Sequence, residues 1–95
     1  MSVAVSIADD QRPRLPRGVR LKFDEARNEW LLLAPERVII PDETALEILR
    51  RCDGVASLSA IIDELAAGYD AAREVIAADV RQLVADLTDK GIIRR

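Results

Sequence analysis

The chain has 95 residues, of which 49% are hydrophobic, 3% aromatic and 33% charged, and its net charge at pH 7 is −3. This length suits one domain with a modest core, which has to be aliphatic because aromatic residues are scarce. The absence of histidine excludes catalytic and metal sites that depend on imidazole. The longest uncharged apolar stretch, residues 55–62, falls far short of the roughly 18 residues that a membrane span requires, so we expect no membrane insertion.

The single cysteine, Cys52, excludes a disulfide within the chain and agrees with a reducing cytoplasm. It falls on an apolar helical stripe, so we interpret it as a buried structural thiol rather than a nucleophile. The N-terminus lacks the basic start and the long apolar segment of a signal peptide. There is no glycine-rich phosphate loop and no Cys/His cluster with metal-ligand spacing. We therefore predict a cytoplasmic protein that is not an enzyme and carries no cofactor or metal.

Residues 1–18 contain Pro13, Pro16 and Gly18 among charged residues and show no sustained period. We interpret them as a mobile N-terminal arm, which leaves residues 19–95 for the folded domain.

Charge is distributed unevenly along the chain. Residues 1–41 hold seven basic and six acidic residues, whereas residues 42–95 hold seven and eleven. Five basic residues fall between Arg12 and Lys22 with no acidic residue among them. Such a run suits either a solvated arm or contact with an acidic partner or nucleic acid.

Three short strands are predicted next. Residues 19–24 alternate between apolar and polar, which is the period of a half-buried strand, and the polar residues 24–29 follow as a hairpin loop. The second strand, residues 30–34, is apolar on both faces, so it is central or has its second face covered. Residues 35–36 then turn the chain into a third strand over residues 37–40. Because this strand is the last in its sheet, it leaves an edge that something must cover or use.

Two helices with clear boundary signals follow. Asp42 is a good N-cap for the first helix, and Gly54 can adopt the positive φ that ends it. Ser57 caps the second helix, which continues to about Gly68 with apolar residues at helical spacing.

The third predicted helix, from Ala71 to about Lys90, has an unusually wide apolar face. That face spans about half of the circumference at ~100° per residue. A helix that contacts one layer needs a narrower stripe, so we expect this helix to contact the other helices on one side and the sheet or a ligand on the other. The face comprises Val75, Ile76, Val80, Leu83, Val84 and Leu87.

Three strands followed by three helices, the last two joined by a tight turn, predict an α+β domain of the winged helix-turn-helix-like class. Its three-stranded antiparallel sheet would precede the three helices.

Four stretches are distinctive in this order and spacing: LPRGVRLKFDEARNEWLLLAPERV, TALEILRRCDG, IIDELAAGYD and DVRQLVADLTDKGII. Together they resemble the PqqD family, pyrroloquinoline quinone biosynthesis protein D, from about Arg12 to Ile93. The resemblance implies a peptide chaperone, a recognition element for a ribosomally made precursor peptide. It also implies two partners: the precursor peptide PqqA, and the radical S-adenosylmethionine enzyme PqqE, which crosslinks a Glu and a Tyr of that peptide. The iron–sulfur clusters and S-adenosylmethionine belong to the enzyme.

The resemblance further implies where the peptide binds. In related elements the peptide adds as a strand to the third strand of the sheet and lies in a groove against the third helix. Strand addition supplies affinity through main-chain bonds, and side-chain pockets supply selectivity. Matched onto this sequence, the strand comprises Arg37, Val38, Ile39 and Ile40, and the groove wall comprises Asp79, Val80, Leu83, Val84 and Leu87. Each apolar member of that wall could equally be core.

DNA binding is a second hypothesis, because helix-turn-helix domains insert a helix into the major groove. The third helix would be the reader, but its acidic residues outnumber its basic ones. Duplex affinity depends on neutralising phosphates, so we expect no nucleic-acid partner.

An adaptor or oligomerisation module is the third hypothesis. In the second strand, Trp30 and Leu32 share a face that the sequence does not assign to the core. We expect these residues to favour a weak homodimer, which would compete with a peptide for the edge strand.

Overall fold

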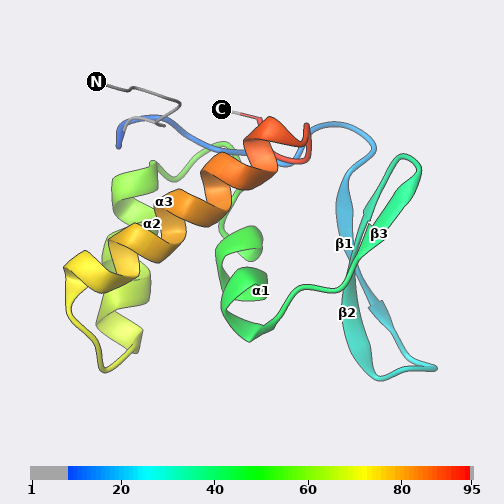
Figure 1. Ribbon diagram of the computed structural model, residues 1–95, viewed down its shortest axis with the longest axis horizontal. Coiled ribbons are helices and arrows are strands. Elements are labelled where there is room, and N and C mark those ends of the chain that lie inside the picture. The colour runs from blue at the N-terminus through cyan, green and yellow to red at the C-terminus, as the bar shows by residue number, and fades with distance from the viewer. Residues whose placement is uncertain (1–8, 95) are drawn as a thin grey trace.

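A computed structural model describes residues 9–94 of the chain. Three strands, β1 (Arg20–Asp24), β2 (Glu29–Ala34) and β3 (Arg37–Ile39), precede three helices, α1 (Glu43–Arg50), α2 (Leu58–Gly68) and α3 (Arg73–Asp89). The sheet is antiparallel in the order β1-β2-β3. Figure 1 shows the sheet at one end of the molecule, α2 and α3 at the other, and α1 between them. The α+β architecture predicted from the sequence is confirmed.

The register of the sheet decides which side chains meet the helices. Leu32 of β2 pairs with Leu21 of β1 on one side and with Ile39 of β3 on the other. Leu32 is fully buried, and both partners pack against the core. Because side chains alternate along a strand, Leu31 and Leu33 lie on the opposite face. The sequence did not show whether the face that carries Leu32 belongs to the core. In the structure this face is the inner one.

This register corrects the reasoning for a homodimer. Leu32 has no exposed surface, so it cannot contact a second copy of the chain. Trp30 is half-buried on the same face; its ring centroid lies 5.3 Å from that of Phe23, in an edge-to-face arrangement. The guanidinium carbon of Arg50 in α1 lies 4.9 Å from the Trp30 ring centroid. These contacts attach α1 to the sheet, because a cation over an indole face is attracted by the ring quadrupole.

Side-chain caps fix the starts of the first two helices, as the sequence predicts. The Asp42 carboxylate accepts a hydrogen bond from the Ala45 amide at 2.8 Å, and the Ser57 hydroxyl accepts one from the Ala60 amide at 3.1 Å. Each bond satisfies an amide that has no partner inside its helix. The third helix begins two residues later than expected.

The core is aliphatic and draws on every part of the fold. It joins β2 to all three helices and to the C-terminal residues Ile92 and Ile93. Cys52 belongs to this core, and burial raises the pKa of its thiol to about 12. A thiol with so high a pKa stays protonated near neutral pH and is a poor nucleophile, as the sequence indicates.

The expectation of a mobile arm needs correction for residues 9–14. The Leu58 amide donates to the Gln11 carbonyl at 2.8 Å, and the Gly54 amide donates to the carbonyl of the buried Pro13 at 3.0 Å. Arg14 and Arg94 exchange two backbone hydrogen bonds of 2.8 Å. Residues 9–14 thus form a strap across the α1–α2 loop and the C-terminal tail. Side chains add two contacts: Arg81 of α3 pairs with the Asp9 carboxylate at 2.8 Å, and the Arg12 guanidinium donates to the Val55 carbonyl at 2.8 Å. Periodicity could not reveal the strap, because these bonds join segments that are far apart in the sequence. Residues 1–8 of the expected arm lie outside the described residues.

Within residues 9–94, no helix has the length and apolar character needed to cross a membrane. The same residues contain no group of three or more acidic or Cys side chains arranged to hold a metal ion.

Candidate functional site

The outer edge of β3 is the first feature of the candidate site. Strand β3 is at the end of the sheet and pairs only with β2. Val38 is 61% exposed and Ile40 is 55% exposed, whereas Ile39 packs against the core. Exposed and core-facing side chains therefore alternate here, and Ile39 is the core-facing residue of β3. An unpaired edge of this kind is a template for another strand.

The turn before β3 determines which backbone groups face outward. Ala34 and Arg37 pair directly across the two-residue turn at Pro35 and Glu36. Glu36 has a φ of 61°, the left-handed value that the third position of a type II turn requires. Hydrogen-bonded and non-hydrogen-bonded pairs alternate along an antiparallel ladder. Because the pair that closes the turn is hydrogen-bonded, the N–H and C=O of Val38 are directed toward the open edge.

An open recess of about 310 Å³ lies between α1 and α3. Only Ile40 and Pro41 separate the strand from Asp42, the first residue of the recess wall. A strand advances about 3.3 Å per residue, so the edge and the recess are within reach of one short extended peptide. The walls come from the start of α1 and the middle of α3: Asp42, Thr44, Ala45, Ile48, Asp79 and Leu83.

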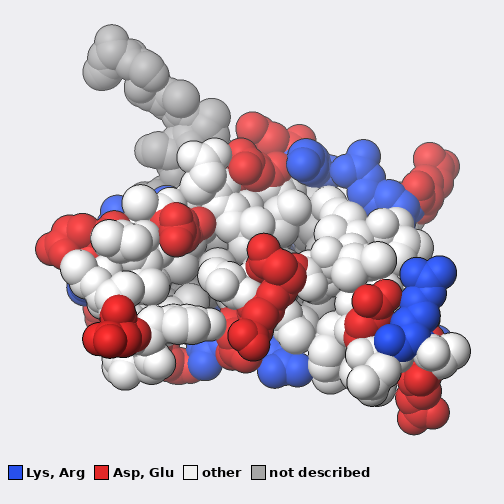
Figure 2. Space-filling model, turned by 60° about the horizontal axis from the view of Figure 1, so that its bottom comes forward, with Lys and Arg blue, Asp and Glu red and all other residues white. Residues whose placement is uncertain are grey.

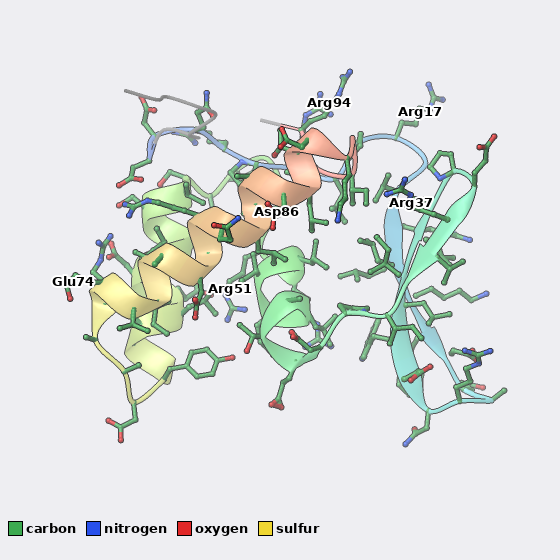
Figure 3. The ribbon with its side chains drawn as sticks, viewed as in Figure 1. Arg17, Arg37, Arg51, Glu74, Asp86 and Arg94 are labelled. Atoms are coloured by element: carbon green, nitrogen blue, oxygen red, sulfur yellow. The ribbon has the colours of Figure 1, made fainter. Side chains whose placement is uncertain are left out.

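Carboxylates dominate the charge around this recess. Figure 2 shows acidic side chains in the middle of one face of the molecule, with uncharged surface on either side of them. Basic side chains gather toward the opposite end of β3: Figure 3 shows Arg17 and Arg37 near the β2–β3 turn. The turn end of β3 thus has a small basic excess, with Arg17 and Arg37 against Glu36, whereas the charged residues that line the recess, Asp42 and Asp79, are both acidic.

Ion pairs hold α1, one wall of the recess, against α2. The Arg51 guanidinium donates to Glu47 at 2.8 Å and to Glu64 of α2 at 2.6 Å. The hydrogen bond that Arg51 donates to Glu47 lowers the pKa of Glu47 below its usual value and raises the pKa of Arg51. These two acidic side chains are therefore already paired, unlike those at the recess.

The five groove-wall residues implied by the resemblance fall into two groups in the structure. Asp79 and Leu83 line the recess, with Asp79 exposed and Leu83 partly buried. Val80, Val84 and Leu87 are buried in the core and do not line it. The physical reason is their spacing: with Ala77 they form the narrow stripe that packs against the rest of the core. The wide apolar face predicted for α3 is therefore a buried stripe flanked by the exposed Val75 and the partly buried Ile76 and Leu83.

Sequence reasoning missed the wall contributed by α1. From the sequence, Asp42 is only a helix cap, and no site role is predicted for Thr44, Ala45 and Ile48. One signal was available: Asp42 follows the edge strand by three residues, so the helix it caps has to begin beside that edge.

A larger recess, of about 600 Å³, is elsewhere, on the outer side of β1 and β2. It is lined by Leu31, Leu33 and residues 22–26 of the hairpin. It does not include the free edge of β3, so we place the candidate site at the smaller recess.

Two substitutions on α3 test which of its residues belong to the recess and which belong to the core. Val84→Ala should lower the free energy of unfolding by about 1–3 kcal/mol, because it leaves a cavity in a fully buried position. Leu83→Ser should cost less stability, because its side chain is already partly in water, but should alter the recess. Urea unfolding curves of both variants measure the difference. A larger loss for Leu83→Ser than for Val84→Ala would place Leu83 in the core.

The family model for coenzyme PQQ synthesis protein D (PqqD) matches residues 29–93. A protein from Rhodopseudomonas palustris strain HaA2, named PqqA binding protein, is 52% identical over 89 residues, which are 94% of this chain and 87% of that protein. A protein of the same name from Xanthomonas oryzae pv. oryzae strain PXO99A is 51% identical over 94% of this chain and 97% of its own.

Two solved structures share the fold. The solution structure of the PqqD portion of Methylobacterium extorquens PqqCD, described as a stand-alone recognition element for ribosomally synthesised and post-translationally modified peptides, is 46% identical. Its TM-score is 0.73, over 87% of this chain and 88% of that one. The crystal structure of PqqD from Xanthomonas campestris is 44% identical with a TM-score of 0.59, over 95% of this chain and all of the other. With a family model that matches most of the chain and relatives that are about half identical, this chain belongs to the PqqD family.

Proposed function

We propose that this chain is a peptide chaperone of pyrroloquinoline quinone biosynthesis. It binds the precursor peptide PqqA as an added strand on β3 and presents that peptide to the radical S-adenosylmethionine enzyme PqqE. The observation that carries the proposal is the unpaired edge of β3, which leads within three residues into the recess between α1 and α3. The names of the relatives, PqqA binding protein, and the recognition-element description of the Methylobacterium structure support the same ligand.

Strand addition suits what β3 offers. The edge supplies main-chain donors and acceptors that any extended peptide can use, and this gives affinity without sequence selectivity. Selectivity then has to come from side-chain contacts, and the recess beside Leu83 is the nearest place for them. A protein with this role needs no catalytic group, since the crosslinking chemistry belongs to its partner enzyme.

Presentation requires that part of the peptide stays outside the chaperone. Strand β3 has three residues, so it can hold only a short part of an extended ligand. The remainder of the peptide would then be free to enter the active site of PqqE. The basic end of the edge, near Arg17 and Arg37, is our candidate for contact with the enzyme.

Calorimetric titration with synthetic PqqA tests this function. We expect saturable one-to-one binding to the peptide and none to duplex DNA, since the acidic chain lacks the positive charge that phosphates demand. A repeat in the presence of PqqE tests presentation, which predicts a ternary complex. The proposal fails if neither titration gives heat at concentrations well above micromolar.

Val38→Pro tests the docking edge. Proline removes the outward-facing amide of Val38, and an edge strand tolerates this loss because the amide is not part of the ladder with β2. The peptide carbonyl opposite then lacks a donor, so we expect binding to weaken at least tenfold, the equivalent of ~1.4 kcal/mol. Val38→Thr keeps the amide and is the matched control. If Val38→Pro remains folded by circular dichroism and binds like the native protein, the peptide does not add to β3.

Weak self-association through the same edge is part of the proposal. Val38 and Ile40 are exposed, and two copies of β3 could pair with each other. We therefore expect sedimentation velocity at high protein concentration to show some dimer, which added PqqA should convert to monomer. A purely monomeric profile throughout the concentration range would show that the edge does not pair with itself.

A further inference from the structure

The recess between α1 and α3 combines two acidic walls with an apolar floor. Asp42 comes from the start of α1 and Asp79 from α3, and the buried Ile48 and partly buried Leu83 lie in the same recess. The two carboxylates come from elements far apart in the sequence, so only the tertiary fold brings them to one place.

Neither carboxylate forms a salt bridge with any of residues 9–94. Acidic residues elsewhere on the helices do: Glu47 and Glu64 pair with Arg51, and Asp63 pairs with Arg73 at 2.6 Å. Asp42 accepts a hydrogen bond at one oxygen, from the amide of Ala45, and its other oxygen has no hydrogen-bond partner among the described residues. Together with Glu43 in the first turn, these carboxylates outweigh the partial positive charge of ~0.5 at the start of α1.

We propose that this recess selects the bound peptide by a lysine or arginine side chain. The inference rests on the proposed function, since it concerns a peptide held on β3. The methylene stem of the basic residue lies over Ile48 and Leu83, and its charged head reaches the carboxylates of Asp42 and Asp79. Long basic side chains commonly bury their stems on apolar surface in this way while the charge stays at a polar rim.

The position of the recess fixes where in the peptide this residue lies. A strand paired with β3 passes Val38 and then Ile40, and each further residue advances it by about 3.3 Å. The basic residue therefore lies two or three positions beyond the strand-forming segment of the peptide, at the end of the edge that is remote from Arg37. It follows that segment in a peptide that runs parallel to β3 and precedes it in an antiparallel one. An acidic residue at that position would be repelled, so the recess also rejects peptides of the opposite charge.

The double variant Asp42→Asn and Asp79→Asn tests the inference in the full chain. Asparagine is as good an N-cap as aspartate, so the variant removes charge while it keeps the cap of α1. We expect its dissociation constant for synthetic PqqA at low salt to rise about three- to tenfold, as the loss of two partly exposed ion pairs implies. Its binding should also depend less on salt concentration than that of the native protein.

The matched control is the double variant Asp86→Asn and Asp89→Asn, which makes the same charge change on α3 alone. Figure 3 shows Asp86 further along α3 from the helix start at Glu74, and neither control residue lines the recess. An equal loss in both double variants would mean general electrostatic steering and would overturn the selective site. Peptides in which each Lys or Arg is replaced in turn by norleucine locate the partner, and one such peptide should bind the native protein and the Asp42/Asp79 variant equally.

The outcomes separate this inference from the proposed function. If the native protein binds PqqA and Val38→Pro does not, but the Asp42/Asp79 variant binds as the native protein does, the recess takes an uncharged side chain and the inference is wrong. If the native protein does not bind the peptide at all, the proposed function itself fails.

Discussion

The pairing of Leu32 with Ile39 is the contact on which the candidate site depends. It places both side chains on the inner face of the sheet, one fully buried and the other packed against the core. A shift of this register by one residue would bring Val38 inward and send Ile39 to solvent, because side chains alternate along a strand. The same pairing leaves the amide and carbonyl of Val38 on the open side. The hydrophobic core therefore sets the orientation of the polar edge.

Several contacts hold the walls of the recess in place. Arg50 stacks on Trp30 and joins α1 to the sheet, whereas Arg51 bonds to Glu64 and joins α1 to α2. The strap at residues 9–14 bonds to the α1–α2 loop and to Arg94 beyond α3. Single exposed ion pairs contribute little to stability, so the importance of these contacts is geometric. They hold α1 against the sheet and against α2, and the recess lies between α1 and α3.

In the proposed site, main-chain groups provide affinity and side chains provide selectivity. Main-chain groups on β3 can accept any extended chain, and the recess adds the side-chain contacts that distinguish one peptide from another. A short edge strand limits how much of the ligand is held, which suits a protein that passes its ligand to an enzyme. A long apolar edge would hold a peptide more tightly, but it would also invite aggregation.

The sequence by itself determined the element order, the caps at Asp42 and Ser57, the buried state of Cys52 and the family. Each of these depends on local spacing or on a motif, and local spacing is visible in one dimension. The tertiary structure alone decided that Val80, Val84 and Leu87 belong to the core, that the Leu32 face is the inner one, and that residues 9–14 are bonded to the domain. It also brought Asp42 and Asp79 to one recess. Periodicity gives the width of an apolar face but not what covers it, and main-chain bonds between distant segments leave no pattern in the side chains.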